Sequence, residues 1–259
     1  MKTALISILI LFPLISFAQR QPRIASGRPG QAIGPLVVGT GVFQVQTGVD
    51  YDRREFTNTK NTKRTLNNVI RFGLSEDFEL SSVIDYRDET FDTNGVENNL
   101  DGVSQFQLGF RYNLIPEADG WIPAIGFQTR FQLKQVGSAY KPNQVTPVML
   151  LVTGHQLTKK FSLNLNGGMS QNGVDNIPIY NYVVSLSQEI SSIFSTVYEA
   201  YGNEYDDNKS DYLGFGVAYR MNNDTQLDVY LSSGNNAGVK EFYFTVGISW
   251  RTFLFNSLK

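Results

Sequence analysis

The chain of 259 residues contains no cysteine and a single histidine, and beyond its first twenty residues it has no apolar run of about 18 residues. The missing cysteine excludes a disulfide scaffold, a cysteine nucleophile and a cysteine-based metal site. One histidine argues against a histidine-rich metal centre, and the missing apolar runs exclude a polytopic helical membrane protein. Disorder is excluded by the 18 Phe and 13 Tyr residues.

The composition that remains is 41% apolar and 18% charged, with a mean hydropathy of −0.20. A soluble protein has such averages. So does a transmembrane β-barrel, because its strands alternate apolar and polar residues. The order of residues along the chain therefore has to decide between the two classes.

Residues 1–18 (MKTALISILILFPLISFA) have the pattern of a secretory signal peptide. Lys2 gives the positive start, Ala4–Ile15 the apolar stretch, and Ser16–Ala18 a small-x-small cleavage site. Pro13 breaks the apolar stretch, which disfavours an uncleaved anchor helix, and the lack of cysteine excludes a lipoprotein anchor. Cleavage removes one Lys and no acid, so the net charge changes from −2 to −3, and we expect no nucleic-acid partner.

Residues 19–40 are rich in Gly and Pro, carry three arginines and show no clean period. We predict that they form a periplasmic lead-in to the first strand. A segment that folds back into a pore is the alternative, and the sequence does not decide between the two.

From residue 41 to residue 259, period-2 alternation recurs roughly twelve times in segments of about 8–11 residues. In the first segment Phe43, Val45 and Val49 share one face and Gln44 and Gln46 the other. The weakest segment is 145–157, which alternates poorly and contains a proline. The predicted strands cover 42–51, 66–74, 80–86, 103–112, 125–131, 145–157, 163–169, 180–187, 194–201, 213–220, 226–231 and 242–251.

The connections between these strands alternate in length. Those after odd strands are long and polar, whereas those after even strands are short, except for 113–121. Short periplasmic turns that alternate with long external loops are typical of outer-membrane barrels, and an even strand number returns both termini to the periplasm. We therefore predict an all-β protein, a closed antiparallel transmembrane β-barrel of about 12 strands, in the cell outer membrane with both termini periplasmic.

A soluble β-sandwich also alternates, with one face of each sheet in a core. Two features disfavour it. It does not explain the alternation of loop lengths, and the apolar faces carry large aromatics near the strand ends, as in the aromatic girdles of barrels. These aromatics are Tyr51, Tyr86, Tyr112, Tyr219 and Trp250.

Charged strand residues are expected to face the lumen, because membrane hydrocarbon rejects charge. They could form a charged constriction that selects solutes, or an internal ion-pair network that bridges strands, and both interpretations stay open. The candidate residues are Arg71, Arg111, Arg130, Arg220, Arg251, Glu79, Asp85, Glu199 and Asp228.

No catalytic, metal or cofactor site is predicted. His155 could act as a base, but it is expected at the periplasmic end, whereas barrel enzymes act mainly at the outer leaflet, so we predict that the protein is not an enzyme. The acidic stretch 203–211 has oxygen ligands suited to Ca²⁺ but matches no EF-hand spacing. The expected external loops 52–64 and 87–102 are basic and acidic, respectively.

Two stretches carry a family resemblance: RPGQAIGPLVVGTGVFQVQTGVDY (28–51) and TQLDVYLSSGNNAGVKEFYFTVGISWR (225–251). With them, the sequence resembles the outer-membrane transporters named for the meta-pathway of phenol degradation. The resemblance implies an outer-membrane channel for small organic compounds. The chain departs from the family pattern where residues 252–259 continue past the final arginine, so a barrel-assembly signal could centre on Phe253 or on Phe255.

We expect a porin-like transporter through which small solutes, organic or aromatic compounds among them, diffuse along a polar lumen. The alternative is a structural or partner-binding barrel with a closed lumen. The expected partners are the lipid bilayer and a small solute, and the oligomeric state is left open.

Overall fold

The computed structural model describes residues 22–116, 122–175 and 177–254. The predicted signal peptide and Phe255 lie outside these residues. Their roles stay predictions.

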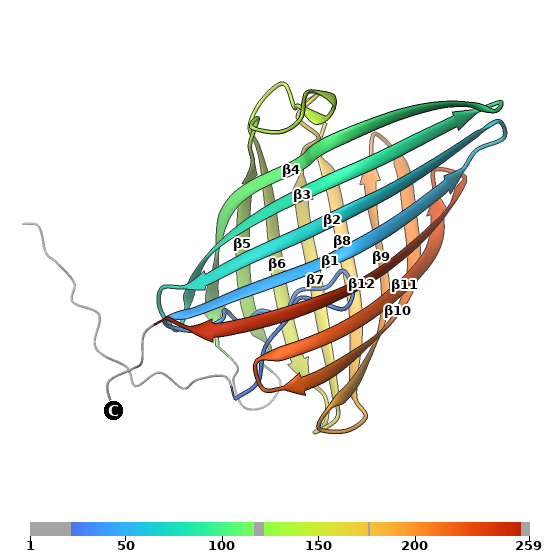
Figure 1. The fold of residues 1–259 in the computed structure, drawn as a ribbon. Coiled ribbons are helices and arrows are strands. Elements are labelled where there is room, and N and C mark those ends of the chain that lie inside the picture. Colours follow the sequence, from blue (N-terminus) through green and yellow to red (C-terminus); the bar gives the residue numbers. More distant parts are fainter. Residues whose placement is uncertain (1–21, 117–121, 176, 255–259) are drawn as a thin grey trace, which may run out of the picture.

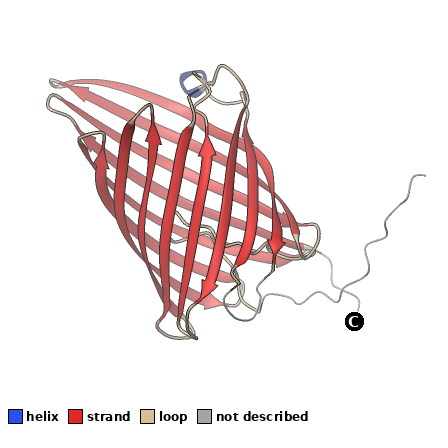
Figure 2. Cartoon of the chain, turned by 180° about the vertical axis from the view of Figure 1, so that it is seen from behind, coloured by secondary structure: helices blue, strands red, loops and turns tan. Residues whose placement is uncertain are grey.

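In the described part of the chain, twelve antiparallel strands form one closed barrel, shown from opposite sides in Figures 1 and 2. Each strand pairs with its neighbours in sequence, and β12 pairs with β1 along the whole length of β1, from Phe253 opposite Val42 to Lys240 opposite Glu55. Closure leaves no strand edge unpaired, which a sheet in lipid requires. The strands are β1 (Val42–Glu55), β2 (Thr59–Gly73), β3 (Phe78–Thr93), β4 (Val96–Ile115), β5 (Ala124–Gln132), β6 (Thr146–Gln156), β7 (Phe161–Ser170), β8 (Ile179–Glu189), β9 (Phe194–Tyr205), β10 (Asn208–Asn222), β11 (Thr225–Asn236) and β12 (Val239–Phe253).

One short 3₁₀ turn, η1 (Ser138–Tyr140), lies in the connection between β5 and β6. Among the described residues, no helix has the length and apolar character needed to cross a membrane.

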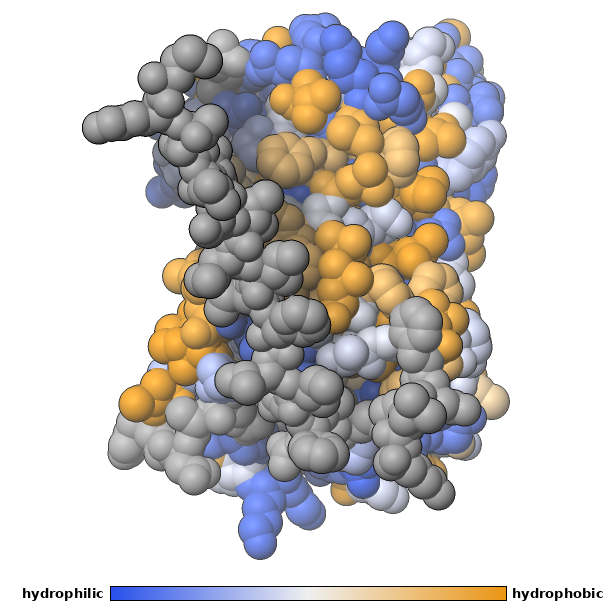
Figure 3. Space-filling model, turned by 90° about the vertical axis from the view of Figure 1, so that its left-hand side faces the viewer, coloured by the Kyte–Doolittle hydropathy of each residue, from blue (hydrophilic) through white to orange (hydrophobic). Residues whose placement is uncertain are grey.

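The distribution of apolar side chains is inverted relative to a soluble protein. On β12, Val246, Ile248 and Trp250 are exposed, whereas the alternate residues Ser249 and Arg251 are buried. Most of the other strands also expose their apolar residues, and on the face seen in Figure 3 orange apolar side chains lie between polar residues at the two ends. A sandwich would bury its apolar faces, so the predicted barrel is confirmed and the sandwich alternative is wrong.

Four connections that the sequence predicted as long loops, 52–64, 87–102, 203–210 and 233–239, are largely strand. The chain turns at 56–58, 94–95, 206–207 and 237–238 instead. Asn94 and Gly95 both have positive φ (52° and 82°), as a two-residue hairpin turn requires. Beyond the hydrocarbon both faces of a strand meet water, so the alternation is lost while the backbone ladder continues. We call this end, which includes the true loops 133–145 and 171–178, the long-hairpin end, and the opposite end the short-turn end.

The weak alternation over 145–157 has a simple cause in β6. Val148, Leu150 and Val152 point inward, and Met149 and Leu151 point outward, so both parities are apolar. The strand is present, with Pro147 next to its first residue.

Residues 22–41, which we call the inner segment, fold back into the barrel, where Figure 1 shows them in blue. Ile24 N–H donates to Asn223 O (2.7 Å) at one short turn, and Thr40 donates to Glu76 at another. Residues 22–40 thus have the alternative placement, inside the pore, and not that of the predicted periplasmic lead-in; residues 19–21 of the predicted segment lie outside the described residues.

Candidate functional site: the lumen and the inner segment

Side chains of the barrel wall bind the backbone of the inner segment at its centre. The Glu199 carboxylate accepts hydrogen bonds from Gln31 N–H (2.7 Å) and Ala32 N–H (3.0 Å). Asn166 accepts from Ile33 N–H (2.8 Å) and donates to Ile33 O (2.9 Å). The segment thus satisfies its polar backbone groups through the wall rather than through secondary structure of its own.

Arg28 anchors the segment to the β1, β11 and β12 side of the wall. Its guanidinium forms an ion pair with Asp228 (2.9 Å), whose side chain is 0% exposed, and donates to Asn67 (3.2 Å) and Thr245 (2.6 Å). Gly48 lies under this guanidinium, and a Cβ there would come within 2.6 Å of it. The sequence did not single out Arg28. The inward glycines Gly48 of β1 and Gly247 of β12, which are paired, could have indicated that another part of the chain packs against the wall there.

A second anchor, on β2, β3 and β4, brings together three of the predicted residues. Arg71 binds the fully buried Glu79 through two hydrogen bonds (2.8 and 2.7 Å), and Arg111 Nε lies 3.7 Å from Glu79. Glu79 also accepts Val38 N–H (2.9 Å), and both arginines donate to Leu36 O. The cluster is an ion-pair network that also holds the inner segment.

Arg130 borders that cluster, close enough to interact electrostatically with Arg71 and Glu79, and the remaining predicted residues lie elsewhere on the wall. Arg130 donates to Ser81 (3.1 Å), and Asp85 accepts from Asn68 N–H at 3.4 Å. At the rim of the short-turn end, Arg251 pairs with Asp224 (2.8 Å), and Arg220 binds Ser192 O. The nine candidates therefore do not form one ring around the lumen.

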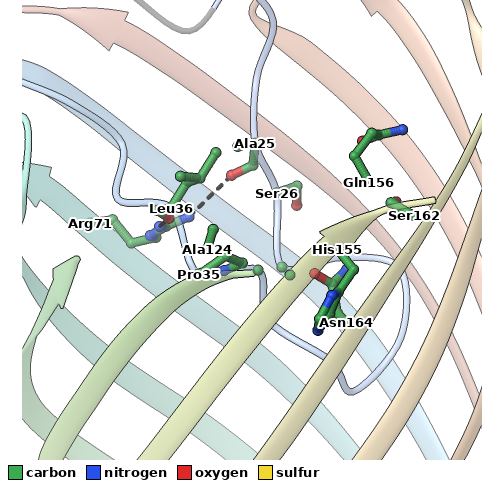
Figure 4. Close-up of a pocket in the computed structure, with 13 residues that line it drawn as sticks. Ala25, Ser26, Pro35, Leu36, Arg71, Ala124, His155, Gln156, Ser162 and Asn164 are labelled. Atoms are coloured by element: carbon green, nitrogen blue, oxygen red, sulfur yellow. Dashed lines mark hydrogen bonds between the residues drawn. The ribbon is translucent and has the colours of Figure 1, made fainter. Parts of the chain in front are cut away.

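Two cavities flank the inner segment toward the short-turn end. One, of about 200 Å³, lies between the segment and β5–β7 and is shown in Figure 4. The other, of about 220 Å³, lies against β7–β11, where the wall is rich in Ser and Thr. Gly34 and Asn164 border both cavities. His155 borders the first with Ser162 and Gln156.

A third cavity, of about 290 Å³, lies at the long-hairpin end and is called here the mouth cavity. Arg87 lines it, with its guanidinium carbon 5.6 Å from the ring centre of Tyr140 in loop 133–145. Burial raises the pKa of Tyr140. The remaining polar lining comes from Gln105, Gln107, Gln132, Ser104, Ser170, Gln171 and Asn172.

Between the mouth cavity and the inner segment, the wall carries an apolar strip. Val148 and Leu150 of β6 and Ile179 and Val183 of β8 point inward and are partly exposed. Leu150 lies over Gly168 of β7, where a Cβ would collide with its Cδ2. From parity we expected a lumen that is polar throughout. The structure instead has an apolar strip on β6 and β8.

Tyrosines fill the opposite side of the lumen, along β9–β12. Tyr201 and Tyr212 stack with ring centres 4.9 Å apart, and the fully buried Tyr230 lies against Gly214. Tyr212 donates to Glu241 (2.7 Å), which also binds Arg54 (2.9 Å). The cavities and the apolar strip thus define one side of the lumen, and packed side chains the other.

A closed twelve-stranded barrel with an apolar outer belt and a lined interior is the architecture of outer-membrane channels. The chain belongs to the family described as "Putative MetA-pathway of phenol degradation", whose model matches residues 26–252. The family resemblance found in the sequence is thereby confirmed.

Solved structures share the fold. An outer-membrane channel from Pseudomonas putida F1 has a TM-score of 0.68 at 12% identity, over 86% of this chain and 100% of that one. The translocator domain of the autotransporter NalP from Neisseria meningitidis has a TM-score of 0.53 at 14% identity (83% and 89%). The NanC porin has a TM-score of 0.52 at 12% identity (79% and 98%). At these identities the likeness concerns the fold alone, and no curated protein matches the chain.

Proposed function

We propose that this protein is a channel through which small organic solutes diffuse across the outer membrane along the β3–β8 side of its lumen. The observation that carries the proposal is the apolar strip, which lies between the mouth cavity and the cavities beside the inner segment. A solute with an aromatic ring can contact Val148 and Leu150 while its polar groups meet the amides of the adjacent strands. The family description, which refers to phenol degradation, favours the same class of solute.

The buried charges fit a structural role in this channel. Arg71, Glu79 and Arg111 bind one another and the inner segment, as do Arg28 and Asp228. Charges satisfied in this way are less available to a passing solute, so we favour the ion-pair network over the charged constriction.

The alternative, a partner-binding barrel with a closed lumen, is favoured by one observation. The inner segment crosses the pore and is hydrogen-bonded on several sides, and tyrosines occupy the opposite half of the lumen. If the segment stays in place and the remaining space is too narrow, no solute passes.

Conductance of the purified protein in planar lipid bilayers separates the two functions, together with swelling of protein-containing liposomes in sugars and in hydroxylated aromatic compounds of similar mass. A channel gives discrete current steps and faster swelling than liposomes made with heat-denatured protein. Absence of both signals from folded protein would favour the closed barrel.

A further inference from the structure

The mouth cavity contains one arginine, Arg87, which has no carboxylate within ion-pair distance among the described residues. Arg28 and Arg71 each pair with a buried acid. Among the described residues, Arg87 forms no ion pair; its guanidinium makes one long hydrogen bond to Thr65 (3.4 Å) and lies over the Tyr140 ring. It is also the one charged side chain among the residues that line this cavity.

The acidic residues near Arg87 are engaged elsewhere. Glu89, two positions along β3, accepts from Asn61 (2.8 Å) and lies 3.9 Å from Lys63. Asp101 accepts the Tyr86 hydroxyl (2.7 Å) on the outer face of the hairpin. Asp85 accepts a backbone N–H and attracts Arg87 electrostatically, but it forms no ion pair with it. An anion in the cavity would therefore meet the guanidinium without displacing an internal partner.

The remaining lining suits a small solute with a ring and hydroxyl groups. Stacking on Tyr140 holds the flat guanidinium in place, which lowers the entropic cost of binding a carboxylate in two-point fashion. Gln105, Gln107 and Gln132 offer amide donors and acceptors around it. The cavity volume of about 290 Å³ is near the lower limit of small-molecule pockets, roughly 300 Å³, which favours a single-ring compound.

We propose that the mouth cavity is a binding site for small hydroxylated monocarboxylates, aromatic acids in particular, with Arg87 as the residue that binds the carboxylate. The role of this site rests on the proposed channel function, because the site would select the solutes that go on to the apolar strip.

The test compares 4-hydroxybenzoate with its neutral analogue 4-hydroxybenzyl alcohol. Binding to the purified, folded protein in detergent is measured by isothermal titration calorimetry, and interruption of single-channel current is measured in planar bilayers. We expect 4-hydroxybenzoate to bind and to interrupt the current. The alcohol should bind at least about tenfold more weakly, because a charge-assisted hydrogen bond is lost. Arg87→Gln should weaken 4-hydroxybenzoate binding by a similar factor and leave alcohol binding unchanged.

Two further variants keep the result interpretable. Arg64→Gln removes a neighbouring cation on β2 that does not line the mouth cavity and should leave binding unchanged, and Arg87→Lys retains the charge if Arg87→Gln fails to fold. Equal affinities for acid and alcohol, or no effect of Arg87→Gln, would overturn the site. Current without 4-hydroxybenzoate binding overturns this inference and leaves the channel standing, whereas Arg87-dependent binding without current retains the site and overturns the channel.

Discussion

At the scale of single residues, Glu79 is a buried carboxylate whose charge depends on its partners in the lumen. It is fully buried, and it meets two arginines and the backbone N–H of Val38. Glu79→Gln should lower the free energy of unfolding by roughly 3–5 kcal/mol, because it leaves two buried guanidinium groups without a counter-charge. The measurement is urea unfolding of the protein in lipid vesicles, followed by tryptophan fluorescence.

The matched control is Asp88→Asn, which removes an acid from an exposed ion pair. Arg64 and Asp88 lie 3.4 Å apart, with side chains that are 63% and 47% exposed. Pairs of this kind contribute about 1 kcal/mol or less. Equal losses for the two variants would contradict a special role of the buried cluster.

Residue parity was sufficient to place Arg71, Glu79 and Arg111 on the inner face, because period 2 fixes which side chains share a face. It could not identify their partners. Leu36 and Val38 belong to a segment without periodicity, so nothing in the sequence relates them to the wall. Arg87 was assigned to a loop because acidic residues on both faces of its hairpin hid the alternation.

At the scale of elements, the inner segment is held by contacts that substitution can weaken one at a time. Asp228→Asn removes the counter-charge of Arg28 and should loosen the segment. The reporter is Gly34→Cys, the sole thiol in this cysteine-free chain, at a position where a Cβ meets no atom within 4 Å. We expect the rate of maleimide labelling at this cysteine to rise several-fold in the double variant.

Asp88→Asn in the same Gly34→Cys background should leave the labelling rate unchanged, because its ion pair lies outside the lumen. An unchanged rate with Asp228→Asn would mean that Glu199 and Asn166 hold the segment without help from Arg28.

The apolar strip on β6 gives a prediction for transport. Leu150→Asn replaces a partly exposed inward side chain with a polar amide of smaller volume. Uptake of single-ring aromatic solutes into liposomes should fall relative to uptake of sugars of similar mass, because apolar contact is lost while the opening is not narrowed. Leu150→Met keeps the apolar surface and should behave like the unsubstituted protein, and a parallel fall for sugars would point to damage of the barrel instead.

At the scale of the whole molecule, the order of the strands and their closure followed from alternation and loop length alone. The extent of the barrel did not, because four hairpins extend past the region where one face meets lipid. The same limit applies to the inner segment, whose position depends on scattered hydrogen bonds with the wall rather than on a repeating pattern.

Orientation in the membrane is a property of the whole molecule. We propose that the long-hairpin end faces outward and that both termini face the periplasm, as even-stranded barrels are arranged. Two exposed residues mark the opposite ends of the barrel. Val174 is 69% exposed in loop 171–178, and Lys159 lies in the turn between β6 and β7. A bulky, membrane-impermeant maleimide should label Val174→Cys in intact cells, and Lys159→Cys only after the outer membrane is permeabilised. The reverse pattern would invert the barrel and place the mouth cavity in the periplasm, where Arg87 would meet solutes on their way out rather than on their way in.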